Sequence, residues 1–157
     1  MLPSKNTLRG TVAALGLLLG LLALPTTTAQ AATPDKVYAA DAFKATNKAR
    51  TDHHRVTLKQ SSCLQKYATK QAKKMARAEQ IFHQQLDPIE SDCHLMRAGE
   101  NVAYGYPNGT SLVVDGWMNS PPHRANILNR KYRLMAIGAK LGDDNRWYVS
   151  QVFGAKR

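Results

Sequence analysis

The chain is poor in cysteine and lacks the short motifs that mark several common enzyme classes. It contains 2 cysteines and no CxxC pair, which disfavours a zinc site built on thiolates. It has no HExxH motif, which would place two metal ligands and a base on one helix face, and no GxSxG turn around a serine nucleophile. The sequence therefore carries no complete catalytic motif of these kinds.

Acidic residues are also scarce, since 11 Asp and Glu face 22 Lys and Arg and leave a net charge of +11. A basic balance favours anionic partners. For an exported protein, anionic cell-envelope components or lipid headgroups suit this charge better than nucleic acid, which we do not expect as a partner. The alternative is that the charge only keeps the protein soluble.

Long apolar runs are absent except over residues 12–24, which follow two basic residues and precede Ala29-Gln30-Ala31. This order predicts a secretory signal peptide over residues 1–31; an uncleaved anchor is the alternative. Removal of its two cations leaves residues 32–157 with a net charge of +9 (22 − 2 − 11). We expect this part to be a secreted, monomeric single domain without a membrane span.

The two cysteines, Cys63 and Cys93, remain in the exported part, where the medium is oxidising. They are therefore predicted to form one disulfide. It would close a loop of about 30 residues and contribute roughly 3–4 kcal/mol in the chain-entropy description. A metal site of cysteine and histidine is the weaker alternative.

Two amphipathic helices are predicted in the first half of the exported part. The first begins at Thr33-Pro34, a cap followed by a proline at the first helical position, and fades near Asp52. The second is capped by Ser61 or Ser62 and has an apolar face at i, i+3, i+4 and i+7 spacing. That face consists of Leu64, Tyr67, Ala68, Gln71, Ala72, Met75 and Ala76. The outer face carries Lys66, Lys70, Lys73 and Arg77, and a charged stripe of this kind is usually solvated.

The middle of the chain is predicted to be less regular. Residues 84–99 read as an irregular segment, and residues 100–104 as one short helical turn that Asn101 could cap. Thr110 or Ser111 is predicted to cap the next helix, and Ser120-Pro121-Pro122 to open another.

The last quarter changes to strand patterns. Residues 134–141 and 147–153 are predicted strands, joined by a hairpin loop over residues 142–145. Helices first and a hairpin last indicate an α+β fold.

Four segments carry a resemblance to a known family. They are Asn47-Lys48-Ala49-Arg50, Gly99-Glu100-Asn101-Val102-Ala103, the twelve residues WMNSPPHRANIL at 117–128, and Ser150-Gln151-Val152-Phe153-Gly154. In this order they resemble the CAP family (cysteine-rich secretory proteins, antigen 5 and pathogenesis-related 1) in its bacterial form. The resemblance implies an α-β-α sandwich with a central antiparallel sheet of about three strands.

The resemblance also implies a cleft where His83, Glu100 and His123 meet. Residues expected to support it are Asn101, Ser120, Arg124, Asn126 and Tyr148. Ser120 stands where animal and plant members have a second Glu, and Tyr148 where they have a closing-strand His. Two imidazoles and a carboxylate could coordinate a divalent metal such as zinc at His83 and His123, activate a water, or hold a polar headgroup.

Three functions follow as hypotheses. The first is an extracellular binding module for a lipid, a sterol or an envelope component. The second is a metal-assisted hydrolase that uses the same cleft. The third is a structural exported protein with a vestigial cleft. The incomplete catalytic motif favours the first, and no cofactor is required for it.

Overall fold

The structure is a computed structural model that describes Met1 and residues 31–156; the predicted signal peptide lies outside the described residues. Ala31–Arg157 forms one compact unit. Four strands make its sheet in the order β1-β3-β4-β2. Their bounds are Lys59–Gln60 (β1), Leu95–Tyr104 (β2), Leu134–Leu141 (β3) and Trp147–Lys156 (β4).

The long strands β2, β4 and β3 pair antiparallel, and the two-residue β1 adds a parallel edge beside the start of β3. The predicted strands over 134–141 and 147–153 are confirmed, and β4 continues to Lys156. The predicted α+β fold with about three antiparallel strands is confirmed as well, with β1 as an addition.

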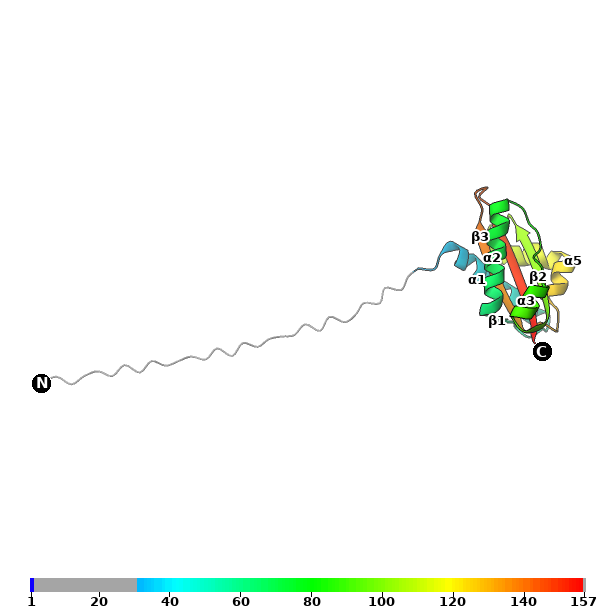
Figure 1. Cartoon of the computed structure of the whole chain (residues 1–157), viewed down its shortest axis with the longest axis horizontal. Coiled ribbons are helices and arrows are strands. Elements are labelled where there is room, and N and C mark those ends of the chain that lie inside the picture. Colours follow the sequence, from blue (N-terminus) through cyan, green and yellow to red (C-terminus); the bar gives the residue numbers. More distant parts are fainter. Residues whose placement is uncertain (2–30, 157) are drawn as a thin grey trace. The chain divides into compact units, whose positions relative to one another are not determined.

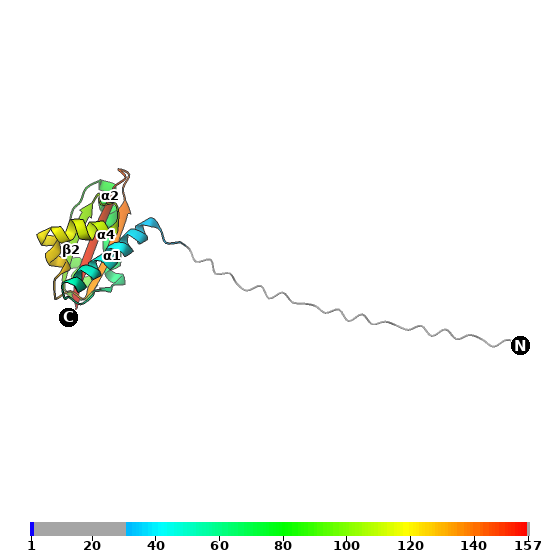
Figure 2. The same cartoon turned by 180° about the vertical axis from the view of Figure 1, so that it is seen from behind.

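Two long helices cover opposite faces of this sheet. Helix α1 (Pro34–Asp52) lies on one face and α2 (Ser62–Ala78) on the other (Figure 1 and Figure 2). The shorter helices are α3 (Asp87–Asp92), α4 (Gly109–Ser111), the π-helical η1 (Leu112–Gly116), the 3-10 helix η2 (Trp117–Asn119) and α5 (Pro121–Ile127). Figure 2 shows α4 beside α1 on the same face. The predicted α-β-α layering is therefore present.

Helix α2 packs by the apolar face that its spacing predicted. Leu64, Ala68 and Met75 are fully buried against the sheet. The approach is so close that a Cβ at Gly138 of β3 would lie 2.3 Å from the backbone of Ala68, so only glycine fits there. Ser61 is the cap, because its Oγ accepts a hydrogen bond from the Leu64 N–H at 3.4 Å.

The disulfide between Cys63 and Cys93 is confirmed, with 5.8 Å between the two Cα atoms. It joins the first turn of α2 to the residue that ends α3. The bridge therefore ties the segment before β2 to the helix that packs on β3 and β4.

The prediction for residues 84–104 is wrong. This segment contains α3 and then the ten-residue strand β2. Glu100 and Asn101 lie in the middle of that strand and cap no helical turn. The reason is burial on both faces: all six residues from 98 to 103 are buried, so no apolar–polar alternation marks the strand.

Two caps also differ from the prediction. Asn108, and neither Thr110 nor Ser111, caps α4, because its Oδ1 accepts from the Ser111 N–H at 2.8 Å. Thr33 stands at the cap position of α1, but its side chain makes no cap hydrogen bond. The carbonyl of Thr33 accepts from Lys36 and Val37 instead, so the helix begins where predicted without the hydroxyl.

The described residues contain no helix that combines the length and the apolar character needed to cross a membrane.

Candidate functional site

The carboxylate of Glu100 is the centre of the candidate site, and it is saturated with donors. Its side chain is 2% exposed. Oε2 accepts from His83 Nδ1 at 2.9 Å and from the Gln84 N–H at 3.1 Å, and Oε1 accepts from Gln84 Nε2 and Ser150 Oγ, both at 2.7 Å. A buried carboxylate needs such partners to offset its desolvation. Glu100 therefore anchors the loop after α2 to the sheet.

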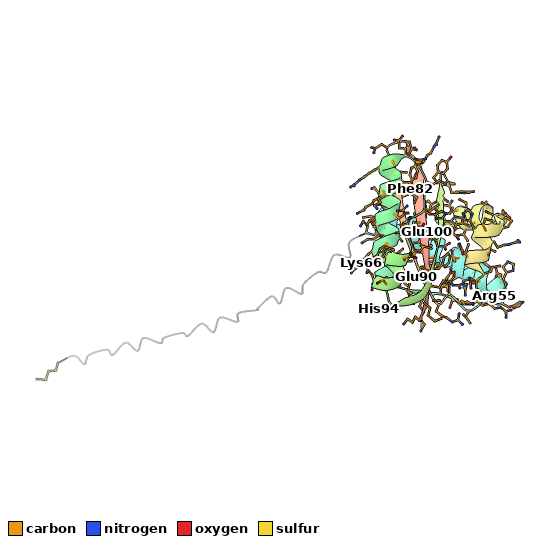
Figure 3. The ribbon with its side chains drawn as sticks, turned by 45° about the vertical axis from the view of Figure 1, so that its right-hand side comes forward. Arg55, Lys66, Phe82, Glu90, His94 and Glu100 are labelled. Carbon is orange, nitrogen blue, oxygen red and sulfur yellow. A yellow bond between two sulfur atoms is a disulfide. The ribbon has the colours of Figure 1, made fainter. Side chains whose placement is uncertain are left out.

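This loop reaches Glu100 because α2 ends sharply. Glu79 adopts a left-handed backbone (φ 49°) at the C-cap, which turns the chain back along the sheet. Gln71, buried on α2, then donates from Nε2 to the Phe82 carbonyl at 2.5 Å. The two contacts place His83 and Gln84 over β2, and Figure 3 shows Glu100 between α2 and α5.

The His83 ring is held at one nitrogen and open at the other. An ionised carboxylate only accepts hydrogen bonds, so the bond to Glu100 places the proton of neutral His83 on Nδ1. The side chain is 61% exposed, which leaves Nε2 toward solvent. A carboxylate that fixes one imidazole nitrogen in this way also fixes the orientation of the other.

His123 is held in a parallel manner from the other side of β2. It is the third residue of α5, and its Nδ1 lies 2.8 Å from Ser120 Oγ. Ser120 precedes α5 at the cap position as predicted, but its hydroxyl serves His123 and caps no backbone N–H. Burial, and secondarily a positive charge on His83, lower the pKa of His123, so the neutral imidazole is favoured.

Lowering the pH is expected to destabilise the wild-type protein relative to His123→Asn. Because the folded-state pKa of His123 is below the unfolded value of about 6.5, the unfolded chain takes up the proton first. Stability from this group is complete above pH 6.5 and is lost as the pH falls through the range down to the lowered pKa. Urea unfolding of both proteins at pH 7.5, 6.5 and 5.5 measures this. If the free energy of unfolding of the wild type rises relative to that of His123→Asn on acidification, the pKa of His123 is not lowered in the folded protein.

A hollow of about 450 Å³ opens beside these residues. Its walls are largely apolar and aromatic, with Ser120 and His123 as the polar part. They are formed by Ile81, Val102, Ala103, Tyr104, Gly105, Tyr106, Gly116, Trp117, Ser120 and His123. Glu100 and His83 are not among the lining residues, although His83 is near enough to His123 for its charge to add to burial in lowering the pKa of His123. The arrangement suits an apolar ligand with a polar end.

A buried amide network fixes the backbone under His123. Asn101 Nδ2 donates to the His123 carbonyl at 3.2 Å and to Gln151 Oε1 at 2.9 Å. Asn126 Nδ2 donates to Asn101 Oδ1 at 2.9 Å and to the Glu100 carbonyl at 3.2 Å. These bonds join α5 to the edge strand β2. They give a structural role to the asparagine in each of two motifs, Asn101 of GENVA and Asn126 of WMNSPPHRANIL.

The other two predicted supporting residues have different positions. Arg124 is exposed, and within residues 31–156 its guanidinium makes no ion pair or hydrogen bond. Tyr148 is buried, and its hydroxyl donates to Asp144 at 2.7 Å and to neither His83 nor Glu100. Its ring stacks on Tyr104 at 5.9 Å between centroids and packs in one apolar cluster with Val102, so it supports the hollow from behind these two lining residues.

Sequence reasoning missed two residues of this site, Gln84 and Gln151. Gln84 gives two of the four hydrogen bonds to Glu100, and no motif marks it. Gln151 lies in the SQVFG segment and joins the amide network to Thr46 of α1 through a 2.8 Å bond. The match of SQVFG to the family was the signal that could have identified it.

The donor set falls short of a catalytic zinc site. Such a site uses three protein ligands, and among the described residues no group of three His, Cys, Asp or Glu side chains converges to hold a metal. Glu100 cannot serve as the third zinc ligand beside the two histidines, because four hydrogen-bond donors already occupy its two oxygens. Zinc at His83 and His123 stays a prediction that rests on two imidazoles.

Comparison with known proteins identifies relatives in sequence and in structure. The sequence model of the Cysteine-rich secretory protein family (CAP) matches residues 43–153. A curated relative, "Uncharacterized membrane protein YlbC" of Bacillus subtilis, is 37% identical over 60 residues, which are 38% of this chain and 16% of that protein. The chain thus corresponds to a small part of that relative's length.

Two solved structures have similar folds. An extracellular protein containing a SCP domain from Bacillus anthracis has a TM-score of 0.66 and 25% identity, over 82% of this chain and 45% of that one. An outer surface protein from Borrelia burgdorferi has a TM-score of 0.66 and 21% identity, over 73% of this chain and 90% of that one. The second likeness, at 21% identity, concerns the fold alone.

Proposed function

The chain belongs to the cysteine-rich secretory protein (CAP) family, and from this membership we propose that it is an exported binding module whose hollow takes a lipid or sterol. Export is supported by the predicted signal peptide and by the disulfide, which persists in oxidising surroundings. The SCP-domain relative from Bacillus anthracis is described as extracellular, which agrees with this location.

The saturation of Glu100 is the observation that carries the proposal. A general base must have a free lone pair for the proton that it takes, and a metal ligand needs one for the metal. Four donors occupy both oxygens of Glu100, so the carboxylate acts as an anchor. This geometry supports binding more than the metal-assisted hydrolase.

The hollow supplies the chemistry for an amphiphilic ligand. Ile81, Val102 and the rings of Tyr104 and Tyr106 offer apolar contact for its body. His123, kept neutral by its surroundings, accepts a hydrogen bond at Nε2 from a hydroxyl headgroup. His83, which is near enough to His123 for its charge to add to burial in lowering the pKa of His123, offers a second imidazole to a headgroup that extends beyond the hollow. A sterol, or a lipid with a hydroxyl-bearing head, has this combination of surfaces.

Replacing both His83 and His123 by alanine is expected to weaken sterol binding by at least about tenfold, because two headgroup contacts are worth roughly 1.4 kcal/mol or more together. Titration with the fluorescent sterol dehydroergosterol, followed by energy transfer from tryptophan, measures the affinity. Laurate, whose head is anionic, is a second probe and should bind more weakly than the sterol at pH 7.5.

A matched control changes two exposed histidines elsewhere. His53→Ala together with His94→Asn keeps the histidine count equal, and Asn tolerates the left-handed backbone at position 94 (φ 52°). This control is expected to bind within about twofold of the wild type. Equal sterol affinity of the two double variants would remove the hollow as the binding site.

A further inference from the structure

A second surface lies on the far side of α2 from Glu100, and the helix itself carries cations and no acidic residue there. The helix sequence SCLQKYATKQAKKMARA contains five basic residues and no Asp or Glu. All five, Lys66, Lys70, Lys73, Lys74 and Arg77, are exposed, and none forms an ion pair within residues 31–156. Figure 3 shows Lys66 on the outer side of α2.

This composition differs from an ordinary solvated helix face. Solvated faces usually mix both signs, and Glu–Lys pairs at i, i+4 stabilise a helix by a few tenths of a kcal/mol. Lys66 and Lys70, Lys70 and Lys74, and Lys73 and Arg77 are like-charge pairs at that spacing, which destabilise it by similar amounts. The helix keeps this repulsion although a single Glu would relieve it.

The cations line a groove. One hollow of about 830 Å³ runs along α2 and includes Lys66, Lys70 and Lys73. A second, of about 670 Å³, is lined by α1, α2 and residues 137–139 of β3 and includes Lys36 and Lys44. The two share Gln60, Gln65, Thr69 and Lys73, so they adjoin. The one acid in the lining, Asp35, is already paired with Lys140 at 3.5 Å.

We propose that this groove, which we call the lysine groove (Lys36, Lys44, Lys66, Lys70 and Lys73), binds an extended polyanion with closely spaced phosphate or sulfate groups. Lys66 and Lys73 are about 10 Å apart along the helix at 1.5 Å per residue. Several anionic groups of one linear chain can therefore contact the row at once. The hydroxyls of Ser62 and Thr69 between the lysines can add hydrogen bonds to the same groups.

Two other occupants fit less well. A membrane surface would favour large apolar side chains beside the cations, and none of the exposed large apolar residues lies on α2. A peptide added as a strand would need the free edge of β3, but β1 covers Leu134 and Met135, and Gln65 Nε2 occupies the Ile137 carbonyl at 2.8 Å. An added strand could therefore pair with β3 only beyond Ile137, whereas the basic residues run along the whole of α2.

The test compares two variants that lose equal charge. The groove variant is Lys66→Gln, Lys70→Gln, Lys73→Gln; the control is Arg97→Gln, Arg130→Gln, Lys131→Gln, three exposed cations outside the groove. The probe is inorganic polyphosphate, with vesicles of phosphatidylglycerol and phosphatidylcholine as the membrane arm. Affinity is measured across a series of salt concentrations.

The groove variant is expected to bind polyphosphate at least about tenfold more weakly and to show a salt dependence shallower by about 2, at roughly 0.7 for each lost phosphate contact. The control variant should stay within about twofold of the wild type. Equal weakening of both variants, or of neither, would overturn the proposal. So would stronger binding to the vesicles than to polyphosphate at equal anion concentration.

The proposal does not rest on the hollow beside His123. The groove variant should retain sterol binding, and the His83, His123 double variant should retain polyphosphate binding. Because the substitutions remove like-charge pairs from α2, the midpoint of thermal unfolding should not fall. A lower midpoint together with weaker binding would attribute the loss to unfolding and would also overturn the proposal.

Discussion

Replacing Glu100 by alanine is expected to lower the free energy of unfolding by about 3–4 kcal/mol, the range for leaving partners of a buried charged group without their acceptor. Four donors lose their acceptor together. The buried Ser150 hydroxyl has no water to turn to, whereas the exposed part of the loop at His83 does. Urea unfolding at pH 7.5 gives the value.

Glu100→Gln separates the charge from the shape. An amide keeps one acceptor for His83 and the Gln84 N–H, and its NH₂ can donate to Ser150 Oγ or to Gln84 Oε1 once that amide is turned. The expected loss is therefore smaller, about 1–2 kcal/mol. A loss for glutamine as large as for alanine would mean that the charge itself holds the loop, and a negligible loss for both would contradict the anchor.

The same variants test whether the cleft is vestigial. If Glu100 only stabilises the fold, Glu100→Ala changes unfolding and leaves sterol affinity unchanged at a temperature where the protein is folded. If it also orients His83, as the 2.9 Å bond to Nδ1 indicates, sterol affinity falls as well. Glu100→Gln, which keeps an acceptor for Nδ1, should then restore most of the affinity.

The sequence predicted those elements whose packing leaves a local periodic pattern. Helix α2 buries one face only, so Leu64, Ala68 and Met75 recur at helical spacing. β3 and β4 are apolar runs of suitable length around a polar turn, and Ser120-Pro121 marks the start of α5. In each case the deciding contacts lie close in sequence or follow one period.

β2 could not be predicted in the same way, because its polar residues are satisfied by distant parts of the chain. Glu100 meets Ser150, 50 residues away, and Asn101 meets Gln151 at the same separation. A sequence window around Glu100 shows charge and amide where a buried strand should be apolar. Only the family motif indicated that these residues belong together, and it gave no partners such as Gln84.

Removing the disulfide is the other large change that we expect. Cys63→Ser, Cys93→Ser and the double variant should each lower the free energy of unfolding by about 3–4 kcal/mol, because the bridge closes 30 residues and its loss frees the unfolded chain. Either single substitution breaks the same bond, so the double variant should lose no more than about 1 kcal/mol beyond a single one.

This loss differs in kind from that at Glu100, because it acts mainly on the unfolded state. α3 remains attached in the folded protein, since Glu90 Oε1 accepts from the Ala98 N–H at 2.7 Å and Ile89 is fully buried. Sterol affinity of the folded double variant should therefore match that of the wild type. A marked loss of affinity would show that the bridge holds β2 and Glu100 in place, and the anchor would then depend on the covalent link between α2 and α3 as well as on hydrogen bonds.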